Sequence, residues 1–125
     1  MTFLPKDVQE AWKNREGPAI LATVAEGGEP NIIYVTCVAA FSDNQLVIAD
    51  NYFCKTRRNI LLGSKGSLLF RSKEGKAFQV KGTLEYHENG EMFDYMKSWN
   101  PPQHPGHAAA VLMVKEVYSG ADKLC

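Results

Sequence analysis

The chain has 125 residues, in which 14 basic side chains balance 14 acidic ones to a formal net charge of zero. This balance argues against a general nucleic-acid binder, which needs a basic surface to displace counterions. No apolar run approaches the roughly 20 residues of a membrane span and the first residues show no signal-peptide pattern, so we expect one domain over residues 1–125 with no nucleic-acid or membrane partner.

The first half of the chain alternates between apolar runs and polar turns. Apolar residues at helical spacing predict an amphipathic helix over residues 5–15. A strand is expected over residues 19–25, followed by a hairpin turn whose paired glycines supply positive φ. Residues 30–41 are rich in β-branched and aromatic side chains, which predicts one long second strand. A third strand is expected over residues 45–49.

A cluster of three cations and a hydroxyl follows the third strand. Lys55, Thr56, Arg57 and Arg58 begin a predicted helix that ends at Gly63. The start of a helix presents free N–H groups and the positive end of its dipole, so it can bind an anion such as a phosphate. Adjacent residues point different ways on a helix, so at most one of the two arginines should face that phosphate. The alternative is that these charges form a solvated helix face.

The second half of the chain predicts further strands and one more helix. Strands are expected over residues 66–72 and 77–87, then a short helix over residues 91–99. A loop with three prolines leads into a sixth strand over residues 108–117, and the residues after it form a tail without a predicted element. Hairpin connections favour a mainly β, α+β domain, in which a meandering antiparallel sheet closes into a small barrel.

The cysteines and histidines carry no specific motif. Cys37, Cys54 and Cys125 are widely spaced, odd in number and form no Cys-x-x-Cys pair, so we expect free thiols in a reducing cytoplasm. His104 and His107 lie in one loop without a third ligand beside them, which favours a pocket wall or a plain turn over a metal site. We assign no metal ligand and no catalytic residue.

The pattern as a whole resembles the FMN-binding split-barrel family, which is related to pyridoxamine 5′-phosphate oxidase, and in particular its short single-domain members. The resemblance covers about residues 17–120. It rests on the strand that ends in a Gly-Gly hairpin, on the helix start Lys55-Thr56-x-x-Asn59 and on the closing strand over residues 108–118. It implies a six-stranded antiparallel split β-barrel with flanking short helices, and a single FMN-binding domain over residues 1–125.

The resemblance also implies where FMN would lie. The second strand would contact the isoalloxazine ring and the ribityl chain, the end of the third strand would pass along the flavin, and Lys55 and Thr56 would hold the phosphate. Trp99 would stack on the ring, with core packing as the alternative role. Family members are usually homodimers with the flavin at the interface, so the loop over residues 99–107 would reach the flavin of the second chain. The candidate cofactor-binding residues are Tyr34, Val35, Thr36, Cys37, Ala49, Asp50, Asn51, Lys55, Thr56 and Trp99.

The function implied is that of an FMN flavoprotein, either an oxidoreductase on a small substrate or an electron-transfer protein. The chain stops at Cys125, without the C-terminal extension that binds substrate phosphate in pyridoxamine 5′-phosphate oxidases. Three alternatives stay open. The domain could be a non-enzymatic carrier of a flavin or another ligand, or a split barrel that uses the deazaflavin F420, or one that uses haem. Neutral net charge weakly disfavours F420, which calls for a larger basic groove.

Overall fold

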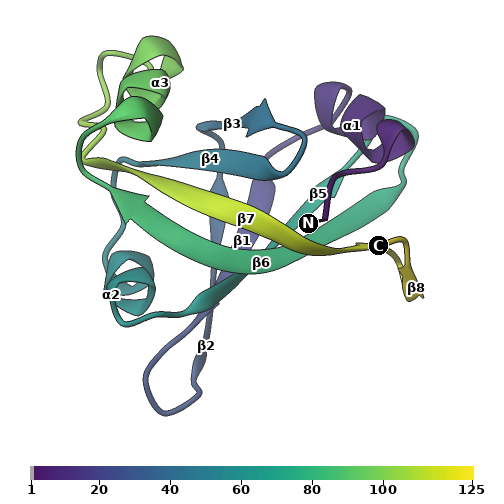
Figure 1. Ribbon diagram of the computed structural model, residues 1–125, viewed down its shortest axis with the longest axis horizontal. Coiled ribbons are helices and arrows are strands. Elements are labelled where there is room, and N and C mark those ends of the chain that lie inside the picture. Colours follow the sequence, from purple (N-terminus) through teal and green to yellow (C-terminus); the bar gives the residue numbers. More distant parts are fainter. Residues whose placement is uncertain (1) are drawn as a thin grey trace.

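The computed structural model describes residues 2–125 as a mainly β domain with three short helices (Figure 1). The predicted helices over residues 5–15 and 91–99 are confirmed as α1 and α3, and the predicted strand over residues 77–87 is confirmed as β6. In chain order the elements are α1 (Lys6–Lys13), β1 (Ala19–Val24), β2 (Pro30–Val35), β3 (Val38–Ser42), β4 (Gln45–Asp50), α2 (Lys55–Leu61), β5 (Lys65–Arg71), β6 (Ala77–His87), α3 (Glu91–Trp99), β7 (Ala108–Ser119) and β8 (Asp122–Lys123).

The strands form one antiparallel sheet in the order β2-β1-β5-β6-β7-β4-β3, with β8 paired to β7. Sheets twist, and this one curls over itself into a half-barrel whose two edges, β2 and β3, are consecutive in the chain (Figure 1). The predicted fold class, an antiparallel split barrel with flanking short helices, is therefore confirmed. The predicted count of six strands is wrong, because the described residues contain eight.

One of the two strands beyond the predicted six arises because the predicted strand over residues 30–41 is broken into β2 and β3. Val35 is the last residue of β2 and pairs with Ala19 of β1. Val38 is the first residue of β3 and pairs with Ile48 of β4, at the opposite edge of the sheet. The two residues between them carry the chain across the opening of the half-barrel. A strand cannot pair at both edges without such a break, and β-propensity does not reveal the crossing.

The other strand beyond the predicted six is β8, in the C-terminal residues that were expected to form no element. β7 runs on to Ser119, and the chain then turns back so that Lys123 of β8 pairs with Tyr118. The backbone N–H groups of Leu124 and Cys125 both donate to the carbonyl of Val117. The last residues are therefore held against β7, although their sequence has no strand pattern.

Two apolar clusters hold the elements together. The larger one fills the half-barrel, where α1 closes one end by placing Trp12 edge-on against Phe70 with ring centroids 5.0 Å apart. The smaller one lies under α3, where Met92 and Met96 pack against β4 and β7. Figure 1 shows α1 and α3 near opposite ends of the sheet, and α2 apart from both, near the end of β6. Among the described residues, no helix is long and apolar enough to cross a membrane.

Candidate functional site

A pocket of about 350 Å³ lies between β2, the end of β4 and the start of α2. Small-molecule sites typically span about 300–1,000 Å³ and combine an apolar lining with a few placed polar groups. This pocket, called the β2–α2 pocket below, fits that description. It is lined by Asn31, Ile33, Tyr34, Val35, Thr36, Cys37, Ala49, Asn51, Tyr52, Phe53, Cys54, Lys55, Thr56 and His104.

The pocket brings together most of the residues predicted from the sequence. The β2 segment provides one wall, because Asn31, Ile33 and Val35 share the inner face of a strand whose side chains alternate. The break after β2 turns the next two residues into the same pocket. From the predicted set it contains Tyr34, Val35, Thr36, Cys37, Ala49, Asn51, Lys55 and Thr56, whereas Asp50 and Trp99 do not line it.

Lys55 and Thr56 form the cationic end of the pocket. Lys55 is exposed and makes no ion pair with any residue of the 2–125 region. The Thr56 hydroxyl is buried and accepts a hydrogen bond of 2.9 Å from the side-chain amide of Asn31. Because its oxygen already accepts, its hydrogen remains available to a ligand oxygen in the pocket. α2 has only seven residues, so the positive charge here comes mainly from the side chains rather than from a helix dipole.

A buried polar network fixes the position of Thr56. The Asn31 amide donates both to Thr56 and, over 3.1 Å, to the hydroxyl of Thr23 on β1. Asn59, one turn further along α2, donates to the same Thr23 hydroxyl over 3.0 Å. Buried polar groups are costly unless paired, so this network ties the start of α2 to β1 and β2 in one arrangement. The motif Lys55-Thr56-x-x-Asn59 thus acts as one structural unit.

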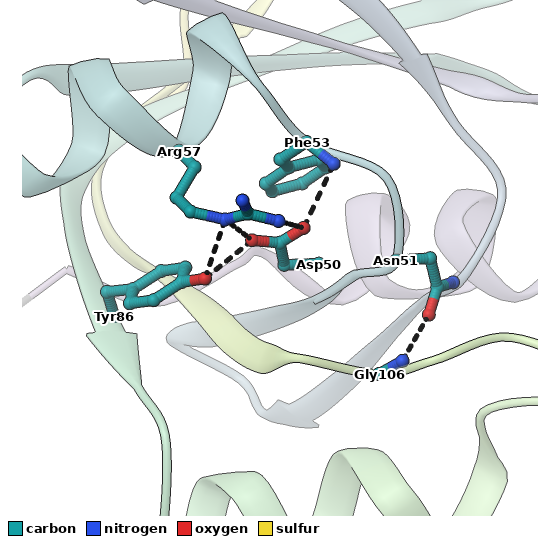
Figure 2. Close-up of polar contacts among 6 residues, drawn as sticks. All are labelled: Asp50, Asn51, Phe53, Arg57, Tyr86 and Gly106. Carbon is teal, nitrogen blue, oxygen red and sulfur yellow. Dashed lines mark hydrogen bonds and ion pairs between the residues drawn. The ribbon is translucent and has the colours of Figure 1, made fainter.

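Asp50 has a structural role rather than a place in the pocket (Figure 2). Its fully buried carboxylate accepts hydrogen bonds from Arg57 at 2.7 and 3.1 Å, from the Tyr86 hydroxyl at 2.6 Å and from the Phe53 backbone N–H at 3.0 Å. The contacts join β4, the loop after it, α2 and β6. Arg57 is therefore committed to Asp50, and the arginine that remains exposed on α2 is Arg58.

The same contacts shift the pKa of each group. Burial alone would raise the pKa of Asp50, but the hydrogen bonds from Arg57, Tyr86 and Phe53 outweigh burial and hold that pKa below its usual range. The hydrogen bond to Asp50 raises the pKa of Arg57 further above neutrality. Burial, together with the hydrogen bond to Asp50, raises the pKa of Tyr86 to about 12. Asp50 and Arg57 are therefore both charged at neutral pH, and Tyr86 is neutral.

Asn51 holds the loop that borders the other side of the pocket. Its side-chain oxygen accepts from the Asn100 amide at 2.8 Å and from the Gly106 backbone N–H at 3.0 Å, the second of which is drawn in Figure 2. Its own amide donates back to Asn100 over 3.1 Å. The Asn51 side chain is thus occupied by the loop, so a ligand would meet this residue through its backbone.

That loop brings His104 to the rim of the same chain's pocket. The Tyr52 hydroxyl lies 3.1 Å from Nδ1 of His104, and the two rings meet edge to face with centroids 5.6 Å apart. Lys97 on α3 donates to the Pro105 carbonyl at 3.1 Å and so ties the same loop to α3. No group of three or more His, Cys, Asp or Glu side chains within residues 2–125 is arranged to hold a metal ion.

Trp99 lies away from the pocket, at the end of α3. Its ring packs against Tyr95 with centroids 6.0 Å apart, in the apolar cluster between α3 and the sheet. Its indole N–H is buried and has no hydrogen-bond partner among the described residues. Within one chain, therefore, Trp99 is partly buried against the smaller apolar cluster and does not line the β2–α2 pocket.

Several pocket residues escaped the sequence analysis as ligand contacts. Asn31 could have been found, because it shares the inner face of the predicted second strand with Ile33 and Val35. His104 was expected to form a pocket wall or a plain turn, and it does line the pocket. Its contact with Tyr52 carried no signal in the sequence, because the two residues are 52 positions apart and the loop anchored by Asn51 brings them together.

Comparison with known proteins identifies the family. The family model described as pyridoxamine 5′-phosphate oxidase matches residues 4–120, nearly the whole chain. The chain belongs to the pyridoxamine 5′-phosphate oxidase family. Sequence comparison finds a relative in Methanocaldococcus jannaschii, the uncharacterized protein MJ0282. It is 29% identical over 121 residues, which cover 91% of this chain and 80% of that protein.

Solved structures share the family's fold. HupZ of Group A Streptococcus superposes with a TM-score of 0.81 at 23% identity, covering 93% of each chain. An FMN-binding protein of Syntrophomonas wolfei gives a TM-score of 0.70 at 23% identity, over 80% of this chain and 74% of that one. An F420 reductase gives a TM-score of 0.70 at 16% identity, over 92% of this chain and 98% of that one. The split-barrel family and the split-barrel fold that were expected from the sequence are both confirmed.

The Asp50–Arg57 pair gives a stability prediction for this family member. Arg57→Ala leaves a buried carboxylate without its cation, so we expect the free energy of unfolding at pH 7 to fall by about 3 kcal/mol, the lower end of the usual range because Arg57 is partly exposed. The Asp50 pKa is depressed in the folded protein, so the stabilisation is present above the unfolded pKa of about 4 and is lost as pH falls through the folded value.

Urea unfolding at a series of pH values from 7 down to 2 tests this. The difference in free energy of unfolding between wild type and variant should persist down to about pH 4 and narrow as the pH falls further, through the depressed pKa of Asp50. Arg58→Ala is the matched control, since that neighbouring arginine is exposed and makes no ion pair within residues 2–125, and its stability should stay within about 0.5 kcal/mol of wild type. Equal losses in the two variants would contradict the structural role given to Arg57.

Proposed function

We propose that this chain binds FMN in the β2–α2 pocket and works as a small flavoprotein that passes electrons between the flavin and a small substrate or redox partner. The observation that carries the proposal is one pocket with a cationic, hydroxyl-bearing end at Lys55 and Thr56 and a largely apolar wall from β2 and β4. FMN has the matching two parts, an extended ring and a phosphate with nearly two negative charges.

The residues divide the binding between them. Lys55 Nζ would pair with the phosphate, and the Thr56 hydroxyl, held by Asn31, would donate to one of its oxygens. The backbone at the end of β2 and after β4 would offer directed hydrogen bonds to the ring edge, and Ile33 and Val35 an apolar face. When bound, the flavin supplies the redox chemistry itself, while this chain orients it and excludes water.

We further propose that the chain acts as a homodimer with the pocket near the interface. The outer face of β2, β1 and β5 exposes an apolar patch in which Tyr34 and Leu69 flank Ile20 in the sheet register. Ile32 and Tyr34 are 69% and 74% exposed, which is unusual for large apolar side chains on a monomer. Tyr34 lines the β2–α2 pocket as well, so a partner covering this patch would also border the cofactor.

The visible absorption spectrum of the purified protein, with mass identification of whatever denaturation releases, tests the cofactor directly. We expect a flavin spectrum and release of FMN. A colourless protein that also fails to take up added FMN would contradict the proposal. Released haem would contradict FMN as the cofactor and would be compatible with the split-barrel fold.

Lys55→Ala should weaken FMN binding about 10- to 100-fold, because it removes a charge-assisted hydrogen bond to the phosphate. Fluorescence titration of the apoprotein measures this. Riboflavin, which lacks the phosphate, should bind wild type and variant alike, and Lys73→Ala, in the turn between β5 and β6, should bind FMN as wild type does. A variant that purifies with a full complement of FMN would show that the phosphate lies elsewhere.

Ile32→Asp should convert the dimer to a monomer, since it places a charge within the apolar patch at a side chain that is 69% exposed. Light scattering at micromolar concentration gives the mass, and a titration gives the accompanying loss of FMN affinity. Leu124→Asp, at an exposed apolar residue of the C-terminal tail, is the control and should leave both unchanged. Wild-type protein that runs as a monomer would contradict the interface.

A further inference from the structure

A second pocket adjoins the proposed phosphate end of the first. It has a volume of about 360 Å³ and lies between α2 and the turn that joins β1 to β2. Asn31 and Lys55 line both pockets, so the second begins where the proposed phosphate position ends. This second pocket, called the hairpin pocket, is lined by Ala25, Glu26, Glu29, Pro30, Asn31, Lys55, Arg58, Asn59 and Leu62.

The charges of the hairpin pocket are mixed. Glu26 and Glu29 come from the hairpin turn, and Lys55 and Arg58 come from one face of α2, three residues apart. All four side chains are exposed, and none of them makes an ion pair within the described residues 2–125. If Lys55 serves a phosphate, two carboxylates and one guanidinium remain, so the space beyond the phosphate carries net negative charge.

This charge balance bears on which cofactor the site accepts. A flavin that ends at its phosphate, as FMN does, requires nothing of the hairpin pocket. A deazaflavin such as F420, whose phosphate is esterified to a chain that carries further carboxylates, would have to place those carboxylates beside Glu26 and Glu29. Like charges at such short range repel, and at an exposed site the repulsion weakens with salt.

We propose that Glu26 and Glu29 make this chain select a flavin that ends at its phosphate and reject a cofactor whose tail continues with negative charge. The inference rests on the proposed function, because it takes Lys55 as the phosphate ligand. It assigns the choice between the FMN and F420 chemistries, which both occur on this fold, to two residues of the β1–β2 turn.

The test compares three ligands on the apoprotein by fluorescence titration at low salt: FMN, F420 with its oligoglutamate tail, and the tail-less deazaflavin core. Wild type should bind FMN more tightly than F420. In the double variant Glu26→Gln/Glu29→Gln, the affinity for F420 relative to FMN should rise about three- to tenfold, and high salt should reduce the gain. The tail-less core should bind wild type and variant equally.

A matched control removes two charges elsewhere. Glu10→Gln/Glu74→Gln alters α1 and the turn between β5 and β6, leaves the same net charge as the test variant and should not change the affinity ratio. An unchanged ratio in the Glu26/Glu29 variant, an equal gain in the control, or a gain for the tail-less core would overturn the inference. Wild type that binds F420 as tightly as FMN would overturn it while leaving a flavin-type site in place. Wild type that binds neither would remove the proposed function, and this inference with it.

Discussion

The Asp50 carboxylate is fully buried at the end of β4, where it accepts hydrogen bonds from Arg57 on α2, from Tyr86 on β6 and from the backbone of Phe53. A buried charge is tolerated only when it is paired and hydrogen-bonded. The contacts therefore permit essentially one placement of the chain between β4 and α2. That placement sets where α2 starts, and with it where Lys55 and Thr56 stand relative to the sheet.

The residue after Asp50 fixes the loop on the other side of the pocket. Asn51 directs its side chain away from α2 and exchanges hydrogen bonds with Asn100, and it also accepts from the Gly106 backbone. The backbone carbonyl of Asp50 accepts from the N–H of His107, so two consecutive residues hold both borders of the β2–α2 pocket. A site held in this way is formed before any ligand arrives, which lowers the ordering cost of binding.

Local sequence was sufficient for most of the helices and strands and insufficient for the contacts between them. Strand β6 and helix α3 were predictable to the residue because hydrophobic periodicity and turn residues delimit both. The break between β2 and β3 was not, since both halves of residues 30–41 favour strand and only pairing at opposite sheet edges separates them. The grouping of strand two with Lys55 and Thr56 came from family resemblance. The commitment of Asp50 to Arg57 depends on how α2 packs, which no local pattern records.

The three cations that open α2 illustrate how a neutral chain can carry a local charge. Arg57 is neutralised by the buried Asp50, and its helical neighbours Lys55 and Arg58 lie three residues apart on another face, beside a pocket. Because Arg57 is paired with Asp50, the cationic surface here is narrow. It consists of Lys55, which lines the β2–α2 pocket, and Arg58, which shares the hairpin pocket with Glu26 and Glu29. A cationic surface of that size would match a single phosphate better than a long polyanion, which is the charge pattern that the proposed FMN site requires.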